Sequence, residues 1–151
     1  MTCPMVIAGL AAFAALDEGS YKTHNASAAY YLGNLKTVDA AIVRSLSALA
    51  TTVALVYCHK RNRQFRQPQK DGTFIGNLLL MMGVSDKHTE ECLERLWILY
   101  ADHEMTNSTA AFLHAASNLT DPMSCMISGV VSAYGPLHGG KLEYDIILTQ
   151  Q

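Results

Sequence analysis

A long apolar pattern between residues 38 and 60 constrains the fold more than any other feature of the sequence. Apolar side chains recur there at spacings of 4, 3, 4 and 3, at Ile42, Leu46, Leu49, Val53 and Val56. This period places them on one face of an α-helix. Alanines thin the other faces, so neighbouring helices can approach closely on several sides. The pattern predicts an internal helix of a larger helical protein, with this apolar face buried.

The rest of the chain also favours helices. Of its 151 residues half are apolar, only 16% are charged and 4 are proline. Helical periodicity predicts five further helices, over residues 2–16, within 72–83, from about 86 to 100, from 107 or 108 to 119, and from 121 to 134. Residues 18–37 are predicted to be a connector. Asp121 before Pro122 is a strong helix start, and Asn107 or Ser108 can cap the helix before it. With no convincing alternating strand pattern, the predicted fold class is all-α, in one domain.

Composition argues against several classes of protein. The formal net charge of −2 gives no indication of a nucleic-acid partner. Four cysteines lie far apart without a C-x-x-C pair, so reduced and mostly buried thiols are expected rather than a zinc or redox site. The apolar run from Met5 to Leu16 is shorter than the roughly 20 residues that cross a bilayer, and no basic signal-peptide region precedes it. Neither a membrane partner nor secretion is expected.

A basic segment from His59 to Lys70 has two open interpretations. Its cations can complete the end of a helix and continue into a solvated loop. They can also contact phosphate or carboxylate groups of a ligand. Charge alone does not separate the two.

His138 is the more informative of two histidine candidates. Gly135 ends the preceding helix, Pro136 fixes the approach, and Gly139 and Gly140 leave no side chain behind the imidazole. A rigid turn with bare backbone lets a ligand approach closely. A histidine there can donate a hydrogen bond to a developing oxyanion or enolate.

His103, in the sequence Asp102-His103-Glu104, is the second candidate. A zincin would have another histidine four residues later, but that position is Asn107, so no metal site is predicted. His103 lies between the end of one helix and the cap of the next. There its imidazole can meet open backbone amides and an anion that they hold, or serve as a hydrogen-bonded structural histidine.

The two histidine segments together resemble the citrate synthase family. The first reads I-L-Y-A-D-H-E-M-T-N-S-T and the second T-D-P-M-S-C-M-I-S-G-V-V-S-A-Y-G-P-L-H-G-G. Upstream segments such as F-I-G-N-L-L-L-M-M-G are similar to the helical large domain of the same family. The likeness covers roughly residues 5 to 140, includes the methylcitrate and alkylcitrate synthases, and has the style of fungal members.

This resemblance implies a mostly α-helical homodimer that condenses oxaloacetate with an acyl-CoA. His138 matches the catalytic histidine that hydrogen-bonds the thioester carbonyl oxygen and stabilises the enol. His103 matches a histidine that holds oxaloacetate, and Ser108 matches a small hydroxyl residue that lines the oxaloacetate site. Neither a metal nor a cofactor is implied, because acyl-CoA is a substrate. Tyr100 stands where many members have another histidine and receives no role.

The chain also departs from the family pattern. Residues 1–140 are expected to be a truncated large helical domain, and residues 141–151 an unrelated or divergent tail. The second catalytic histidine, in its G-x-G-H setting, is absent from these 151 residues. So are the aspartate that takes the α-proton, the arginines that bind oxaloacetate, and the smaller domain that contacts coenzyme A.

Two functions are therefore open. The first is an acyltransferase of citrate synthase type that joins oxaloacetate to an acyl-CoA or other acyl thioester, giving a citrate or alkylcitrate in a specialised secondary-metabolite pathway. It would need the missing residues from a longer product or a partner chain. The second is a catalytically inactive fragment that pairs through its apolar helices with a full-length homologue. Either protein would be intracellular, in the cytoplasm or the mitochondrion.

Overall fold

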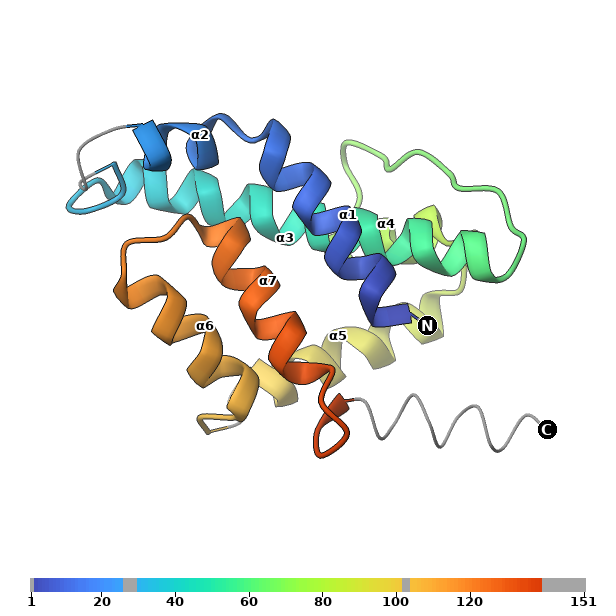
Figure 1. Ribbon diagram of the computed structural model, residues 1–151. Helices are drawn as coiled ribbons and strands as arrows, with labels where there is room; N and C mark the ends of the chain where they lie inside the picture. The colour runs from blue at the N-terminus through green and yellow to red at the C-terminus, as the bar shows by residue number, and fades with distance from the viewer. Residues whose placement is uncertain (1, 26–29, 102–103, 140–151) are drawn as a thin grey trace. The chain divides into compact units, whose positions relative to one another are not determined.

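The computed structural model describes residues 2–25, 30–101 and 104–139. Within these ranges the secondary structure is helical and contains no strand, which confirms the predicted all-α class. The helices are α1 (Thr2–Leu16), α2 (Glu18–Asn25), α3 (Leu35–Lys60), α4 (Phe74–Met81), α5 (Lys87–Ala101), α6 (Asn107–Ser117) and α7 (Pro122–Ala133) (Figure 1). The predicted tail, residues 141–151, lies outside the described residues.

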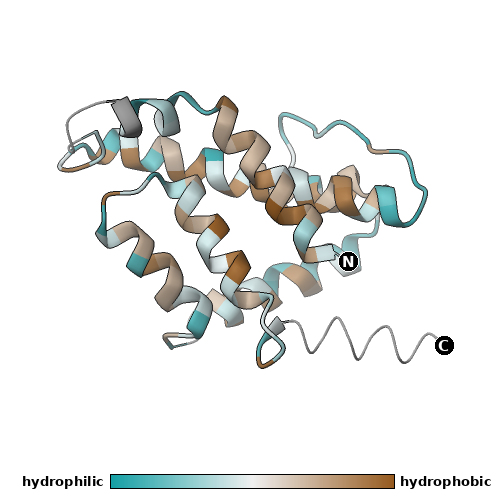
Figure 2. Ribbon diagram, viewed as in Figure 1, coloured by the Kyte–Doolittle hydropathy of each residue, from teal (hydrophilic) through white to brown (hydrophobic). Residues whose placement is uncertain are grey.

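The chain divides into two compact units. The first unit contains residues 1–48 and 105–151, and the second contains residues 49–104. In the first unit α7 packs against α1, α2 and α6, and α1 also contacts α2. Hydrophobic residues run along much of α1 (Figure 2). Leu10 of α1 is fully buried, and Cys125 of α7 is only 2% exposed.

A glycine on α7 lets α6 come close. A Cβ atom on Gly129 would lie 3.3 Å from the backbone carbonyl oxygen of Ser108, which is tighter than an ordinary packing contact. The first turn of α6 therefore rests directly on the backbone of α7. This close approach places Ser108 near the segment that follows α7.

The second unit has a small core between α3 and α4. Ala50 and Ala54 of α3 cluster with Leu78 and Met81 of α4, and Phe65 packs at the edge. The short helix predicted within residues 72–83 is confirmed as α4, but it is not almost wholly buried as expected, because four of its eight residues are buried and Phe74 is 46% exposed. Its N-cap is Thr73, whose hydroxyl oxygen accepts a hydrogen bond from the Gly76 amide.

The predicted buried face of α3 is wrong over much of its length. Ile42 and Leu46 are 47% and 45% exposed, and Val53 is 36% exposed. The buried positions are mostly small residues, namely Ala41, Ser45, Ala48, Ala50, Thr52 and Ala54. Small side chains allow neighbouring backbone to come close, so the alanines define the packed side of the helix. Because apolar residues occur on several sides of α3, periodicity alone could not select the buried one.

By length and composition alone, α3 could also cross a membrane. It has 26 residues, its most apolar window has a mean hydropathy of 1.6, and 44% of that window is buried. The core helix of a globular protein passes the same test. Within the described residues no other helix meets it.

Two local predictions need correction. The predicted connector from residue 18 to 37 begins with α2, whose N-cap is Asp17: its carboxylate accepts a hydrogen bond of 2.9 Å from the Ser20 amide. Helix α6 is capped by Thr106 rather than by Asn107 or Ser108. The expectation of mostly buried thiols holds for Cys58 and Cys125, whereas Cys92 is exposed.

Candidate functional site

Two of the three predicted site residues meet in the first unit. The Nε2 atom of His138 lies 3.1 Å from the Oγ atom of Ser108, although the residues are 30 positions apart in sequence. Ser108 lies in the first turn of α6 and His138 in the turn after α7. The imidazole is exposed and Ser108 is half-buried. A hydroxyl thus engages one ring nitrogen, while solvent or a ligand can reach the histidine.

The turn that carries His138 is held by backbone contacts. The His138 amide donates to the Gly135 carbonyl at 3.0 Å, and the Gly135 amide donates to the Ser132 carbonyl at 3.3 Å. A Cβ atom on Gly139 would lie only 2.8 Å from the Ala133 carbonyl oxygen. The bare backbone of Gly139 therefore packs on the end of α7, and this contact fixes the position of the His138 backbone. Gly140 lies outside the described residues.

Thr106 joins the same hydrogen-bonded group. As the N-cap of α6 its Oγ1 atom accepts from the Thr109 amide at 3.3 Å. The same atom lies 3.1 Å from Ser108 Oγ and 3.1 Å from Thr109 Oγ1. Sequence reasoning missed Thr106 because three successive residues there can all cap a helix. No local signal separates Thr106 from Asn107 and Ser108, since each of the three is a capping residue type with an amide three positions later.

His103, the predicted oxaloacetate ligand, lies outside the described residues, so its position relative to His138 stays a prediction. The chain re-enters the described part at Glu104, whose φ of 51° is unusual for a residue other than glycine. In the described ranges no three His, Cys, Asp or Glu side chains gather where they could hold a metal ion.

Comparison with known proteins identifies the family. A family model described as "Citrate synthase, C-terminal domain" matches residues 2–146. The chain belongs to the citrate synthase family. It is 43% identical over 141 residues to a citrate synthase-like protein of Phoma sp., covering 92% of this chain and 30% of that protein. It is 35% identical over 141 residues to the alkylcitrate synthase tstJ of Talaromyces stipitatus, covering 93% of this chain and 32% of that enzyme.

A solved citrate synthase has the same helical fold. The crystal structure of citrate synthase from Thermotoga maritima superposes with a TM-score of 0.61 at 26% identity, covering 90% of this chain and 33% of that one. The chain therefore spans about a third of the length of these members of the citrate synthase family.

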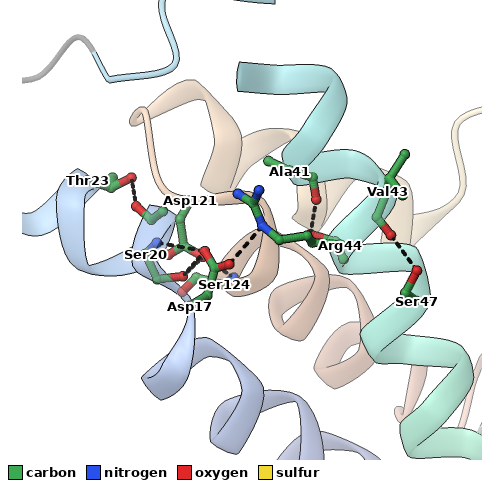
Figure 3. Close-up of polar contacts among 11 residues, drawn as sticks. Asp17, Ser20, Thr23, Ala41, Val43, Arg44, Ser47, Asp121 and Ser124 are labelled. Carbon is green, nitrogen blue, oxygen red and sulfur yellow. Dashed lines mark hydrogen bonds and ion pairs between the residues drawn. The ribbon is translucent and has the colours of Figure 1, made fainter. Parts of the chain in front are cut away.

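A second polar cluster, which we call the buried hub, joins α2, α3 and α7 of this citrate synthase-family chain (Figure 3). Asp121, the N-cap of α7, is fully buried and accepts from Ser20 Oγ at 2.8 Å and from the Ser124 amide at 3.0 Å. Arg44 donates to Asp17 at 2.9 Å. Sequence reasoning found the Asp121 cap but missed the other members.

The hydrogen bonds of the hub keep Asp121 ionised. Burial raises the pKa of its carboxyl, but hydrogen bonds from Ser124 and Ser20 outweigh that effect and hold the pKa below its ordinary value. Burial, followed by the charge of Asp17, raises the pKa of the nearby Tyr31 hydroxyl. The hub is therefore electrostatically organised, although within the described part of the chain Asp121 Oδ2 is buried without a hydrogen-bond partner and the Arg44 side chain is 46% exposed.

One cavity in the described part of the first unit lies away from His138. It measures about 420 Å³ and is lined by Thr23, Tyr30, Tyr31, Leu32 and the segment 117–120. These walls contain hydroxyl, amide and aromatic groups but no charged side chain. The cavity offers no general base or anion-binding cation and so does not resemble a catalytic centre.

In the basic segment from His59 to Lys70, His59 and Lys60 lie in the last turn of α3. The remainder is an exposed loop, apart from half-buried Phe65. The Arg63 guanidinium lies 5.9 Å from the centre of the Tyr57 ring, a cation–π contact. This geometry fits a solvated loop anchored at its start. A ligand contact by its other cations stays a prediction.

Proposed function

We propose that this chain supplies one side of the active site of a citrate synthase-type acyltransferase. The substrates would be oxaloacetate and an acyl-CoA or other acyl thioester, and the product a citrate or alkylcitrate. His138 is the catalytic residue, His103 binds substrate, and Ser108 lines the substrate site and acts there through the His138 imidazole. The observation that carries the proposal is the Ser108–His138 contact of 3.1 Å in a member of this family.

In this reaction His138 would donate a hydrogen bond to the thioester carbonyl oxygen. When a base removes a proton from the α-carbon, negative charge develops on the thioester carbonyl oxygen, and a ring N–H can donate to it. The α-carbon then bonds to the keto carbon of oxaloacetate, whose oxygen takes up a proton. Water finally cleaves the thioester to a carboxylate and a free thiol. The family resemblance assigns the base to a residue outside these 151.

The similarity to an alkylcitrate synthase supports an acyl chain longer than acetyl. The Talaromyces enzyme is 35% identical to this chain over 141 residues, which is 93% of this chain. We propose on this basis that the product is an alkylcitrate made in a specialised biosynthetic pathway. Comparing the preference for acetyl-CoA and longer acyl-CoA substrates between the chimera described below and the parent Talaromyces enzyme tests what residues 2–146 contribute to this choice.

A chimera tests the catalytic proposal. Residues 2–146 of this chain would replace the matching third of the Talaromyces alkylcitrate synthase, with condensation followed as thiol release that requires oxaloacetate. The chimera should turn over, and His138→Gln should reduce its turnover about 100-fold or more, as loss of an oxyanion donor does. His114→Gln, an exposed histidine on α6, is the matched control and should be neutral. Equal activity of the two variants would contradict the proposal.

Exposed apolar side chains favour a second candidate, a non-catalytic subunit that pairs with a homologous chain. In the first unit Ile42 and Leu46 are 47% and 45% exposed, and in the second Leu96 and Trp97 are 44% and 49% exposed. Apolar surface of this kind marks association sites. Light scattering after size exclusion would test pairing of the chain with itself and with the Talaromyces enzyme. A stable monomer that ignores both would exclude it.

A further inference from the structure

Thr106 belongs to a continuous line of hydrogen-bonding groups that ends on the imidazole of His138. Its Oγ1 atom lies 3.1 Å from Ser108 Oγ, and Ser108 Oγ lies 3.1 Å from His138 Nε2. The Nδ1 atom has no partner among the described residues. In the neutral imidazole only one ring nitrogen carries a proton. Whether Nε2 accepts or donates its hydrogen bond therefore decides whether Nδ1 presents a proton or a lone pair to a ligand.

The line can run in two directions. In one, Thr106 donates to Ser108, and Ser108 donates to Nε2, so that the ring proton resides on Nδ1. In the other, Nε2–H donates to Ser108, and Ser108 donates to Thr106, so that Nδ1 is only an acceptor. Heavy-atom distances are the same for both, because hydroxyl protons and histidine tautomers follow from the network.

Two observations favour the first direction. Thr106 Oγ1 accepts the Thr109 amide at 3.3 Å, and when the Thr109 hydroxyl, 3.1 Å away, also donates to it, both of its lone pairs are occupied and its own proton is left for Ser108. Ser108 is also the second residue of α6. The partial positive charge of a helix N-terminus favours a lone pair facing it over an N–H group.

We propose that Thr106 is a positioning residue that fixes His138 in the Nδ1–H tautomer by orienting the Ser108 hydroxyl. The inference rests on the proposed function, because only that tautomer offers a donor to a thioester oxygen. Thr106 never touches substrate in this scheme. Its hydroxyl has two roles, as the cap of α6 and as the first donor in the line of hydrogen bonds from Thr106 through Ser108 to His138, which we call the relay.

The test is nitrogen NMR of the 151-residue chain labelled on its histidine nitrogens, at about pH 8.5, where free histidine side chains are neutral. The spectrum distinguishes a protonated from an unprotonated ring nitrogen. A His138→Asn variant assigns the signals among the 6 histidines. The wild-type chain should show the Nδ1–H form of His138.

Thr106→Asp separates the two roles of Thr106. Aspartate is a strong N-cap, so α6 keeps its start. A carboxylate has no proton to give and accepts from Ser108, which reverses the relay. The His138 proton should therefore move from Nδ1 to Nε2. Thr106→Ser should restore the wild-type spectrum, and Asn107→Asp, which adds the same charge one residue later without removing a hydroxyl, should leave it unchanged.

Each outcome has one meaning. An Nε2–H form in the wild-type chain, or an unchanged proton position in Thr106→Asp, would overturn the relay. A shift in Asn107→Asp equal to that in Thr106→Asp would also overturn it, since charge alone would then explain the change. The readout needs no turnover. A relay that behaves as predicted beside an inactive chimera would refute the proposed function and leave the relay intact.

Discussion

The N-termini of α6 and α7 are both capped by a side chain, but the two caps have different surroundings. Each begins at a capping side chain that accepts an amide hydrogen bond, Thr106 in α6 and Asp121 in α7. At α7 the cap is fully buried, and its other contact is Ser20 of a neighbouring helix. At α6 the cap is half-buried, and its line of contacts runs outward through Ser108 to the exposed His138.

The difference shows how to separate a structural polar cluster from a candidate site. The buried hub carries the charged groups and the shifted pKa of Asp121, yet the central carboxylate of Asp121 is fully buried, out of reach of a ligand. The cluster at α6 is uncharged apart from the titratable imidazole, but it ends on a group that a ligand can reach. Accessibility of the last member, rather than the strength of the electrostatics, distinguishes the site.

The largest expected effect is on stability, at the buried cap. Asp121→Ala removes the N-cap of α7 and the acceptor of the Ser20 hydroxyl, so the free energy of unfolding should fall by about 2–4 kcal/mol. Thr106→Ala removes a cap in a more solvated place and should cost about 1 kcal/mol. Urea unfolding of both variants measures the pair. Equal losses would show that the hub is no more structural than the cap of α6.

The next effect concerns the turn that carries His138. In Gly139→Ala the new methyl would meet the Ala133 carbonyl oxygen at 2.8 Å, so the turn must shift, at a cost of about 1–3 kcal/mol. The Ser108–His138 contact should weaken with it, visible as a changed His138 spectrum. Gly135→Ala is the matched control, since its methyl would meet the Ser132 carbonyl oxygen at an ordinary 3.4 Å. A tolerated Gly139→Ala would mean that the turn does not hold the histidine.

A smaller effect is the pH dependence of the hub. The lowered pKa of Asp121 means that its ionised form stabilises the fold fully above the unfolded pKa, about 3.9, and that this contribution is lost as pH falls through the folded value. The stability difference between wild type and Asp121→Asn should be constant above about pH 5 and shrink in acid. Thr106→Ala alters no ionisable group, so its difference from wild type should stay level. A difference that grows in acid would contradict the assigned sign.

The sequence predicted the parts of this picture that depend on local chemistry. Asp121 before Pro122 is a strong helix start, and α7 begins there. The bare backbone behind His138 was expected to let a ligand approach, whereas the structure shows Gly139 packed against the Ala133 carbonyl oxygen. The family resemblance proposed roles for His138 and Ser108, and the structure brings these two residues into contact. The helical class was readable for α1 and for α3 to α7, because apolar residues recur there with a helical period.

The parts that depend on packing could not be read in the same way. Ile42 and Ala41 are neighbours on α3, and only the tertiary structure shows that the alanine is the buried one. Helix α2 is short and polar, so it has almost no apolar period to detect. Thr106 was hidden among adjacent residues of equal capping ability. Each miss concerns a choice between locally equivalent options.

The central claim is that Ser108 and His138 act as one unit, and a double-mutant cycle in the chimera tests it most directly. Turnover would be measured for Ser108→Ala, for His138→Gln and for both together. If Ser108 acts through the imidazole, each single change lowers turnover and the double variant is no slower than His138→Gln alone. If the two losses multiply, the residues work independently and the account of the site is wrong.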